Sequence, residues 1–359
     1  MAKFYLLAVV LIWLNLQMNA QNSSEQFYLN KAKEYEENLD YQQAQNTYKE
    51  LQRLQPQNIQ YAYKVAECAY RLKDYPQTIQ LARDLLARDS SYVDTYRLLG
   101  NCLDVSGNYS EGVRVLTAGT KRLPYEGSLY LDLGIIELLR NNYNAALDYW
   151  EAGIVAAPRY ADNYYFAAKT YATTDEPLWT IMYAEIFCNI EKSSDRFTEM
   201  SRLLYQKYLE FLEIEPATSP EIYLNRTGTN TFKNAFYDVL NTMRKKNLIT
   251  FNKDVGLIKE GSYLNSVSII RMNFIKLWNE MYADQLDVPL FDWMGLMYSR
   301  GYLHAYNHWL FGPADSRYVV AWQVFYKDEY NAFITWFLAN PLIINPMSYF
   351  VRSKYQKNN

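Results

Sequence analysis

The sequence predicts an all-α protein in which a solenoid of helical hairpins is followed by a helical domain without a repeat. Three observations support this prediction. The 359 residues contain only 13 Gly and 11 Pro, which is few for the many turns of a β protein. A short motif recurs every 34 residues in the first half of the chain. In the second half, apolar residues fall at helical spacing without a repeat.

The first twenty residues differ from the rest of the chain. Lys3 precedes an apolar run from Phe4 to Leu14, and the polar stretch that follows ends at Ala20. This order is typical of a signal peptide, whereas spanning a bilayer takes about 20 apolar residues. We therefore expect residues 1–20 to be a signal peptide, and the mature chain to be exported without an integral membrane span. An uncleaved membrane anchor is the alternative.

The repeated motif is an acidic or amide residue followed by tyrosine. It occurs at Asp40-Tyr41, Asp74-Tyr75, Asn108-Tyr109 and Asn142-Tyr143, each time 34 residues further along. Small residues keep the same step at Ala66, Gly100 and Gly134, and Pro124 and Pro158 close two of the units. Two helices approach closely only where one of them carries Ala or Gly, and Pro cannot continue a helix. Each unit is therefore expected to be one helical hairpin.

With these features, the stretch from Glu25 to Ser194 resembles five tetratricopeptide repeats. The third and fourth copies fit the pattern best, with Leu99-Gly100 and Pro124 in one and Leu133-Gly134 and Pro158 in the other. The fifth copy departs from it, because Glu176-Pro177 replaces the acidic and aromatic pair. Within residues 21–194, the expected units are 25–58, 59–92, 93–126, 127–160 and 161–194.

Residues after 194 keep helical spacing but lose the repeat. Residues 195–220 are expected to form a capping helix and a linker, because apolar positions run from Thr198 to Leu212 and two prolines follow. Residues 221–359 are expected to form a compact, aromatic-rich helical domain. Its predicted helices cover residues 232–243, 264–281, 290–310 with a break near Gly301, and 316–338.

The resemblance implies a right-handed superhelix of stacked hairpins, in which the first helix of each hairpin lines a groove that binds a protein or peptide. By register, the groove residues would be Tyr63, Glu67, Tyr70, Arg97, Asn101, Asp104, Leu131, Ile135, Leu138, Tyr165 and Lys169. Members of the family can hold a terminal carboxylate with Lys or Arg plus Asn from successive repeats. Arg97 and Asn101 could begin such a site, but Asp132 stands where the next Asn would be needed and would repel a carboxylate.

The apolar run at Leu131, Ile135 and Leu138 must cover something, because an apolar stripe on a surface helix is otherwise exposed to water. It could cover a partner, or it could pack against the C-terminal half of the same chain. Both possibilities remain open from the sequence.

Composition and motifs exclude several classes of function. The formal charge is -3, from 36 Lys plus Arg and 39 Asp plus Glu, so nothing indicates nucleic acid as a partner. The sequence has no Gly-rich phosphate loop, no nucleophile elbow and no pair of carboxylates in a recognisable frame. We expect no enzymatic activity and no cofactor.

The two histidines, His304 and His308, are the candidates for metal ligands. They are four residues apart on a predicted helix, a spacing that can direct both imidazoles at one ion. A zinc enzyme of the familiar helical kind also needs Glu directly after the first His, and Ala305 stands there. We therefore expect packed, hydrogen-bonded histidines and no metal.

Together these features predict a non-enzymatic scaffold or adaptor of the cell envelope. The pattern of a signal peptide, repeats and an aromatic helical domain is similar to exported tetratricopeptide proteins of the Gram-negative envelope. The expected location is periplasmic or outer-membrane-associated, with possible peripheral association with an envelope complex. The alternative is a glycan-binding envelope protein, because 35 Tyr and 8 Trp could offer exposed rings on which sugars stack.

Overall fold

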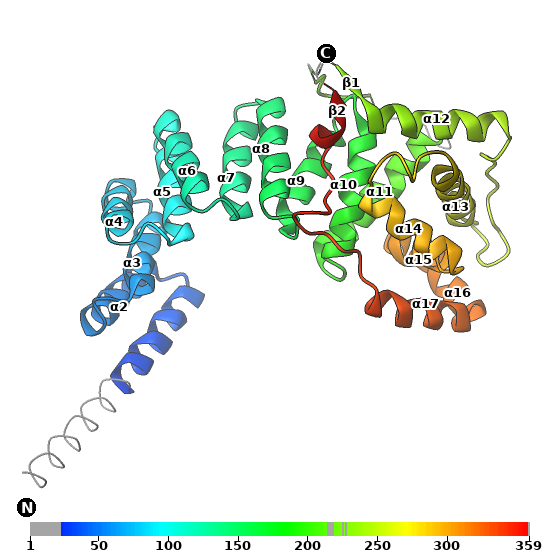
Figure 1. Cartoon of the computed structure of the whole chain (residues 1–359). Coiled ribbons are helices and arrows are strands. Elements are labelled where there is room, and N and C mark those ends of the chain that lie inside the picture. The colour runs from blue at the N-terminus through cyan, green and yellow to red at the C-terminus, as the bar shows by residue number, and fades with distance from the viewer. Residues whose placement is uncertain (1–22, 214–218, 225, 227, 358–359) are drawn as a thin grey trace, which may run out of the picture. The chain divides into compact units, whose positions relative to one another are not determined.

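The structure is a computed structural model that describes residues 23–213, 219–224, 226 and 228–357. The predicted signal peptide, residues 1–20, lies outside these residues. Contacts divide the chain into two compact units, residues 1–124 (unit 1) and residues 125–359 (unit 2). Helical hairpins are followed by helices without a repeat, which confirms the predicted all-α class (Figure 1). None of the helices in the described ranges is long and apolar enough to cross a bilayer.

Unit 1 folds, in its described residues, into three helical hairpins. The helical residues 23–37 pair with α2 (Tyr41–Leu54), α3 (Ile59–Arg71) pairs with α4 (Tyr75–Arg88), and α5 (Val93–Val105) pairs with α6 (Tyr109–Arg122). The acidic member of the repeated motif begins the second helix. The Asp40 and Asp74 side chains accept hydrogen bonds from the backbone N–H groups of Gln43 and Gln77, which caps α2 and α4.

The turn inside each of four hairpins repeats as well. Leu39, Lys73, Gly107 and Asn141 directly precede the caps, 34 residues apart, and all four have φ between 59° and 83°. Only Gly adopts this left-handed conformation without steric cost, so the other three residues are held there by the hairpin. Close helix contact explains the small residue that recurs in each repeat: a Cβ atom at Gly134 would lie 2.1 Å from Nε1 of Trp150.

Unit 2 contains two further hairpins and the remaining helices. Its described elements are α7 (Gly127–Leu138), α8 (Tyr143–Ala156), α9 (Ala161–Tyr171), α10 (Pro177–Ile190), α11 (Asp195–Phe211), β1 (Thr229–Asn230), α12 (Thr231–Lys245), α13 (Leu264–Met281), α14 (Pro289–Ser299), α15 (Leu303–Phe311), α16 (Ser316–Phe325), α17 (Lys327–Ala339), η1 (Arg352–Tyr355) and β2 (Gln356–Lys357). The two short strands pair antiparallel, which brings residues 356–357 back to the start of α12.

Helix α10 explains why the fourth and fifth hairpins belong to unit 2. Every residue from Leu178 to Asn189 is buried, and a helix that is buried all round is a core helix. The sequence placed a domain boundary at residues 195–220, whereas the structure groups residues 125–194 with the C-terminal helices. One aromatic cluster joins these parts, since the Phe232 ring contacts both Trp179 of α10 and Phe350 near the end of the chain.

The predicted helices of the second half differ from the structure in one respect. The break near Gly301 lies between α14 and α15, where Gly301 has φ of 76°. The stretch 316–338, predicted as one helix, is divided into α16 and α17 at Tyr326, which has φ of -110° and ψ of 33°. No Gly or Pro stands at this position, and the helical spacing of apolar residues continues across it. The sequence therefore contains no sign of the break.

Candidate functional site

The first helices of three successive hairpins enclose a pocket of about 550 Å³ in unit 1. We call it the first-helix pocket. Its lining comes from residues 23–37, α3 and the beginning of α5, with one residue from α2: Leu29, Lys33, Glu36, Tyr48, Gln60, Tyr61, Tyr63, Lys64, Glu67, Tyr92 and Asp94. Four tyrosines and five charged side chains therefore face one hollow.

Lys64 organises the charged part of this pocket. Its Nζ lies 3.1 Å from a carboxylate oxygen of Glu36 and 2.8 Å from one of Glu67. The Tyr48 hydroxyl donates to Glu36 at 2.9 Å. One ammonium is thus shared by two carboxylates from neighbouring hairpins, an arrangement that links adjacent repeats and leaves an excess of negative charge around Lys64.

A pair of tyrosine rings forms the aromatic part of the pocket. The rings of Tyr63 and Tyr92 meet edge to face with their centroids 5.3 Å apart. Burial, together with the charges of Glu67 and Asp94, raises the pKa of Tyr63. The hydroxyl therefore stays protonated at neutral pH and can act as a hydrogen-bond donor to a ligand.

The predicted groove residues of unit 1 have different surroundings. Tyr63 and Glu67 line the first-helix pocket, whereas Tyr70, Arg97, Asn101 and Asp104 are half-buried on α3 and α5 and do not. Arg97 lies 3.7 Å from Asp94 in an ion pair within α5. This pairing competes with any carboxylate clamp that would begin at Arg97.

The predicted groove residues on α7 must be corrected. Leu131 is only 5% exposed and packs in the core of unit 2, so it is not available to a partner. Ile135 and Leu138 are partly buried against the same cluster. The apolar run therefore packs in part within the core of unit 2, and α7 contacts α8 and α9.

Tyr165 and Lys169 on α9 are engaged by the next helix of the chain. The Tyr165 hydroxyl donates to Glu199 of α11 at 2.6 Å, and Lys169 Nζ lies 2.7 Å from the other oxygen of the same carboxylate. These hydrogen bonds lower the pKa of Glu199. Helix α11 thus occupies the position next to α9 that a further repeat would take, and it satisfies the groove-facing polar groups.

Comparison with known proteins adds to this geometry. Residues 29–93, which include most of the first-helix pocket, match the family described as tetratricopeptide repeat. This stretch of the chain is therefore similar to tetratricopeptide repeats. A comparison with curated protein sequences finds no match.

Several solved structures are similar to part of this chain. MamA from Desulfovibrio magneticus RS-1 is 15% identical at TM-score 0.37, covering 48% of this chain and 97% of MamA. PilF from Pseudomonas aeruginosa is 14% identical at TM-score 0.40, covering 55% and 95%. YrrB, described as having an unusual peptide-binding site, is 16% identical at TM-score 0.33, covering 50% and 90%.

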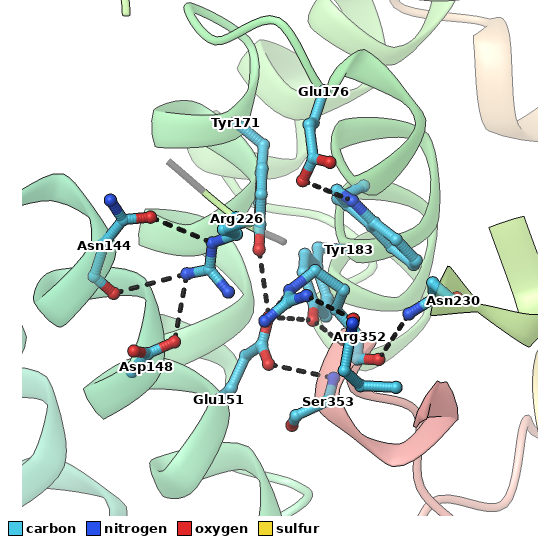
Figure 2. Close-up of polar contacts among 12 residues, drawn as sticks. Asn144, Asp148, Glu151, Tyr171, Glu176, Tyr183, Arg226, Asn230, Arg352 and Ser353 are labelled. Atoms are coloured by element: carbon cyan, nitrogen blue, oxygen red, sulfur yellow. Dashed lines mark hydrogen bonds and ion pairs between the residues drawn. The ribbon is translucent and has the colours of Figure 1, made fainter. Parts of the chain in front are cut away.

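Unit 2 also contains a buried polar network that the sequence did not reveal (Figure 2). Glu151 of α8 is 2% exposed and accepts hydrogen bonds from the hydroxyls of Tyr171 and Tyr183, both at 3.0 Å. Its other oxygen accepts from the backbone N–H of Ser353 at 3.2 Å, while the backbone N–H of Arg352 donates to Tyr183 at 2.8 Å. Burial, with the Glu151 charge, raises the pKa of both tyrosines well above its ordinary value.

This network fastens the segment 350–357 to the repeats rather than forming a reactive centre. In Figure 2, Ser353 and Arg352 lie beside Glu151. The Arg226 side chain points toward Asn144 and Asp148, which are on the same helix α8 as Glu151. The Arg226 guanidinium donates to Asn144 at 3.1 Å and lies 3.0 Å from Asp148. Every polar group of Glu151 has a partner from the chain itself, so the network stabilises the docking of two distant segments.

A second buried network centres on Arg271 of α13. Its guanidinium holds both oxygens of Glu185 on α10, one of them at 2.9 Å, and donates to Asn307 at 2.7 Å and to Tyr208. Tyr306 donates to the same Glu185 carboxylate at 2.9 Å. The cavity beside Arg271 has a volume of about 20 Å³, room for about one water molecule. The network therefore links the four helices α10, α11, α13 and α15, and offers no room for a substrate.

The histidines of α15 are packed into unit 2. His308 is fully buried, and its ring stacks on Trp322 with centroids 4.0 Å apart while Nδ1 lies 2.9 Å from the His304 carbonyl oxygen. His304 lies between Glu329 and Asn265, each 3.2 Å from one ring nitrogen. Burial, with His304 nearby, lowers the pKa of His308 to about 3. Among the described residues, no group of three or more His, Cys, Asp or Glu is arranged to hold a metal ion.

Proposed function

We propose that this protein is a non-enzymatic scaffold that binds a protein or peptide partner in the first-helix pocket. The observation that carries the proposal is the origin of the pocket lining, because it comes from the first helices of three successive repeats. Stacked helical repeats form extended surfaces that suit elongated partners. A partner would therefore lie across the repeats and insert side chains between the tyrosines and the Lys64 group.

The chemistry of the pocket supports a protein partner. Tyr63 and Tyr92 offer rigid aromatic surface that loses little conformational entropy on binding, which is why Tyr is enriched in protein interfaces. Glu36, Lys64 and Glu67 offer both signs of charge for hydrogen bonds to a polypeptide. Such a mixed surface matches an amphipathic peptide better than a uniformly charged ligand.

Photocrosslinking tests this proposal in cells that make the protein. p-Benzoylphenylalanine at position 63 is expected to give a discrete crosslinked species with a second protein, whereas the same probe at Val105, which is 54% exposed, is not. Lys64→Glu places three carboxylates together and is expected to reduce the yield at position 63 about tenfold, which corresponds to about 1.4 kcal/mol. Equal adducts from both positions, or an unchanged yield with Lys64→Glu, would exclude the pocket as the binding site.

The positions of the tryptophans do not favour the glycan-binding alternative. Sugars need exposed ring faces, but every tryptophan in the described residues is buried or half-buried. Trp150, Trp179, Trp278 and Trp322 are among the largest fully buried side chains. Their rings pack inside unit 2, where they stabilise the fold.

We further propose that the chain is exported and acts in the cell envelope. The proposal depends on the charged residue, apolar run and small residue of positions 1–20. Mass spectrometry of the protein from an envelope fraction is expected to identify Gln21 as the new N-terminus. Recovery of the protein in the cytosol with residues 1–20 intact would contradict export.

A further inference from the structure

A second pocket lies within unit 2, beside the C-terminal end of α10. It has a volume of about 590 Å³. We call it the α10 pocket. One wall is the extended segment 341–345 that follows α17, and the other consists of Arg159, Asn189, Ile190 and Lys192. No residue of the first-helix pocket takes part in it.

The α10 pocket brings together two cations. Arg159 and Lys192 both line it, and within the described ranges neither one forms an ion pair with a carboxylate. Glu191, the acidic neighbour of Lys192 in sequence, is bound by Arg196 and by the Ser194 hydroxyl. Lys192 is half-buried and Arg159 is exposed. Two cations without a carboxylate attract an anionic group into the space between them.

Lys192 is also partly removed from water. Its Nζ lies 4.5 Å from the centre of the Phe337 ring. Burial lowers the pKa of Lys192, because the charged ammonium loses hydration. An anion bound beside Lys192 would compensate for this loss.

Asn189 provides a hydrogen-bond acceptor at the same place. The side chain is 5% exposed, and its Nδ2 donates to the Glu185 carbonyl oxygen at 2.9 Å and to the Tyr306 hydroxyl at 2.7 Å. Its Oδ1 is buried and has no hydrogen-bond partner among the described residues. A buried acceptor without a donor is destabilising, so this oxygen suits the N–H group of a ligand.

The third component of the α10 pocket is aliphatic. Ile343 is 68% exposed at the pocket wall, and the adjacent Ile344 is 5% exposed and anchors the segment in the core. The segment therefore presents an apolar side chain on a fixed support. A ligand with an aliphatic group next to its anionic group would cover Ile343.

We propose that the α10 pocket binds a peptide segment that carries a carboxylate beside an aliphatic side chain. Arg159 and Lys192 hold the carboxylate, Asn189 Oδ1 accepts a backbone N–H, and Ile343 packs against the aliphatic group. The carboxylate can belong to an acidic side chain or to the end of a chain, because both present the same two oxygens. A fatty acid has the carboxylate and the apolar chain but no N–H group for Asn189.

Three fluorescein-labelled peptides of five residues test this proposal with the full-length protein by fluorescence polarisation. All contain glycine, serine and leucine. The first ends in a free carboxylate after leucine, the second has glutamate beside leucine and an amidated end, and the third replaces this glutamate with glutamine. At least one acidic peptide is expected to bind about tenfold more tightly than the neutral one, and the tighter of the two identifies the source of the carboxylate.

Variants locate the binding. Lys192→Met and Arg159→Gln are each expected to weaken binding of the acidic peptide about tenfold. Lys276→Met, which removes an exposed lysine of α13 outside the pocket, is the matched control and is expected to bind as the unchanged protein does. Tryptophan fluorescence during urea unfolding checks that unit 2 of each variant is folded.

Three results would overturn the proposal. One is equal binding of the acidic and neutral peptides. Another is undiminished binding by the folded Lys192→Met and Arg159→Gln variants. The third is binding of dodecanoate that depends on Arg159 and Lys192 while the peptides do not bind, which would assign the pocket to a fatty acid. None of these results concerns the first-helix pocket, so the proposed function is tested separately.

Discussion

Full-length protein that carries Arg271→Leu is expected to lose about 3–5 kcal/mol of its free energy of unfolding. Arg271 and Glu185 have side chains only 3% and 1% exposed, so the substitution leaves a buried carboxylate without its counter-charge. Tyr306 and Asn189 remain nearby as neutral groups and cannot replace a guanidinium. Urea unfolding followed by tryptophan fluorescence measures the effect, because all tryptophans of the described residues lie in unit 2.

A surface ion pair provides the control. Arg317→Leu breaks the ion pair between Arg317 and Glu260, whose side chains are 74% and 59% exposed respectively. This substitution is expected to lower the free energy of unfolding by less than about 1 kcal/mol. The double variant Glu185→Leu/Arg271→Leu removes both buried charges and is expected to be more stable than Arg271→Leu alone. If Arg271→Leu and Arg317→Leu had equal effects, the buried pair would not be the bond that joins α10 to α13.

Acid is expected to destabilise unit 2 through His308. Folding lowers the pKa of this imidazole from its ordinary value of 6.5 to about 3, so the unfolded chain binds an additional proton between these values. The stability that neutral His308 contributes is fully present above pH 6.5 and is lost as the pH falls toward 3. At pH 5 the loss is about 2 kcal/mol.

The His308→Asn variant isolates this effect. Asn has an amide N–H that can replace the Nδ1–H donor to the His304 carbonyl oxygen, but it does not titrate. Between pH 7.5 and pH 5.0, the unchanged protein is expected to lose about 2 kcal/mol more free energy of unfolding than the variant. Equal losses for the two proteins would show that His308 is not the group that takes up the proton.

The hairpins could be predicted from the sequence because their determinants are local. The Asp40 and Asp74 side chains cap their helices by accepting hydrogen bonds from backbone N–H groups three residues later. The residues with left-handed backbone conformation stand directly before these two aspartates. Gly134 accommodates Trp150 only sixteen positions further along. A regular step of 34 residues makes such short-range contacts visible as columns in the sequence.

The limits of unit 2 could not be predicted, because they depend on partners far away in the sequence. Helix α10 is covered by α9 and α11 but also by residues near 230 and 350. Leu131 was expected to line a groove because helical register assigns each residue to a face of its helix. Register does not reveal which other segment covers that face. Tyr63 and Glu67 line the first-helix pocket, because their neighbours come from adjacent repeats.

The buried charges were missed on similar grounds. Glu151 follows Trp150, and Glu185 lies between Ala184 and Ile186, so both carboxylates stand among apolar neighbours in the sequence. Their partners, Ser353 and Arg271, lie 202 and 86 positions away. The apolar neighbours are compatible with burial, but the sequence does not reveal which distant group pairs with each carboxylate.

The fastening of residues 350–357 to Glu151 also sets an order for folding during synthesis. In unit 1, even contacts between repeats are short in sequence, such as the 32 positions between Gln45 and Gln77, so its hairpins can form as they emerge. The core of unit 2 can close only after Ser353 has been synthesised and has reached a helix 202 positions earlier. A nascent chain that lacks residues 350–357 therefore leaves the aromatic side chains around Trp179 and Phe232 exposed to water. Until these residues are made, the chain depends on chaperones to keep the exposed apolar surface from aggregating.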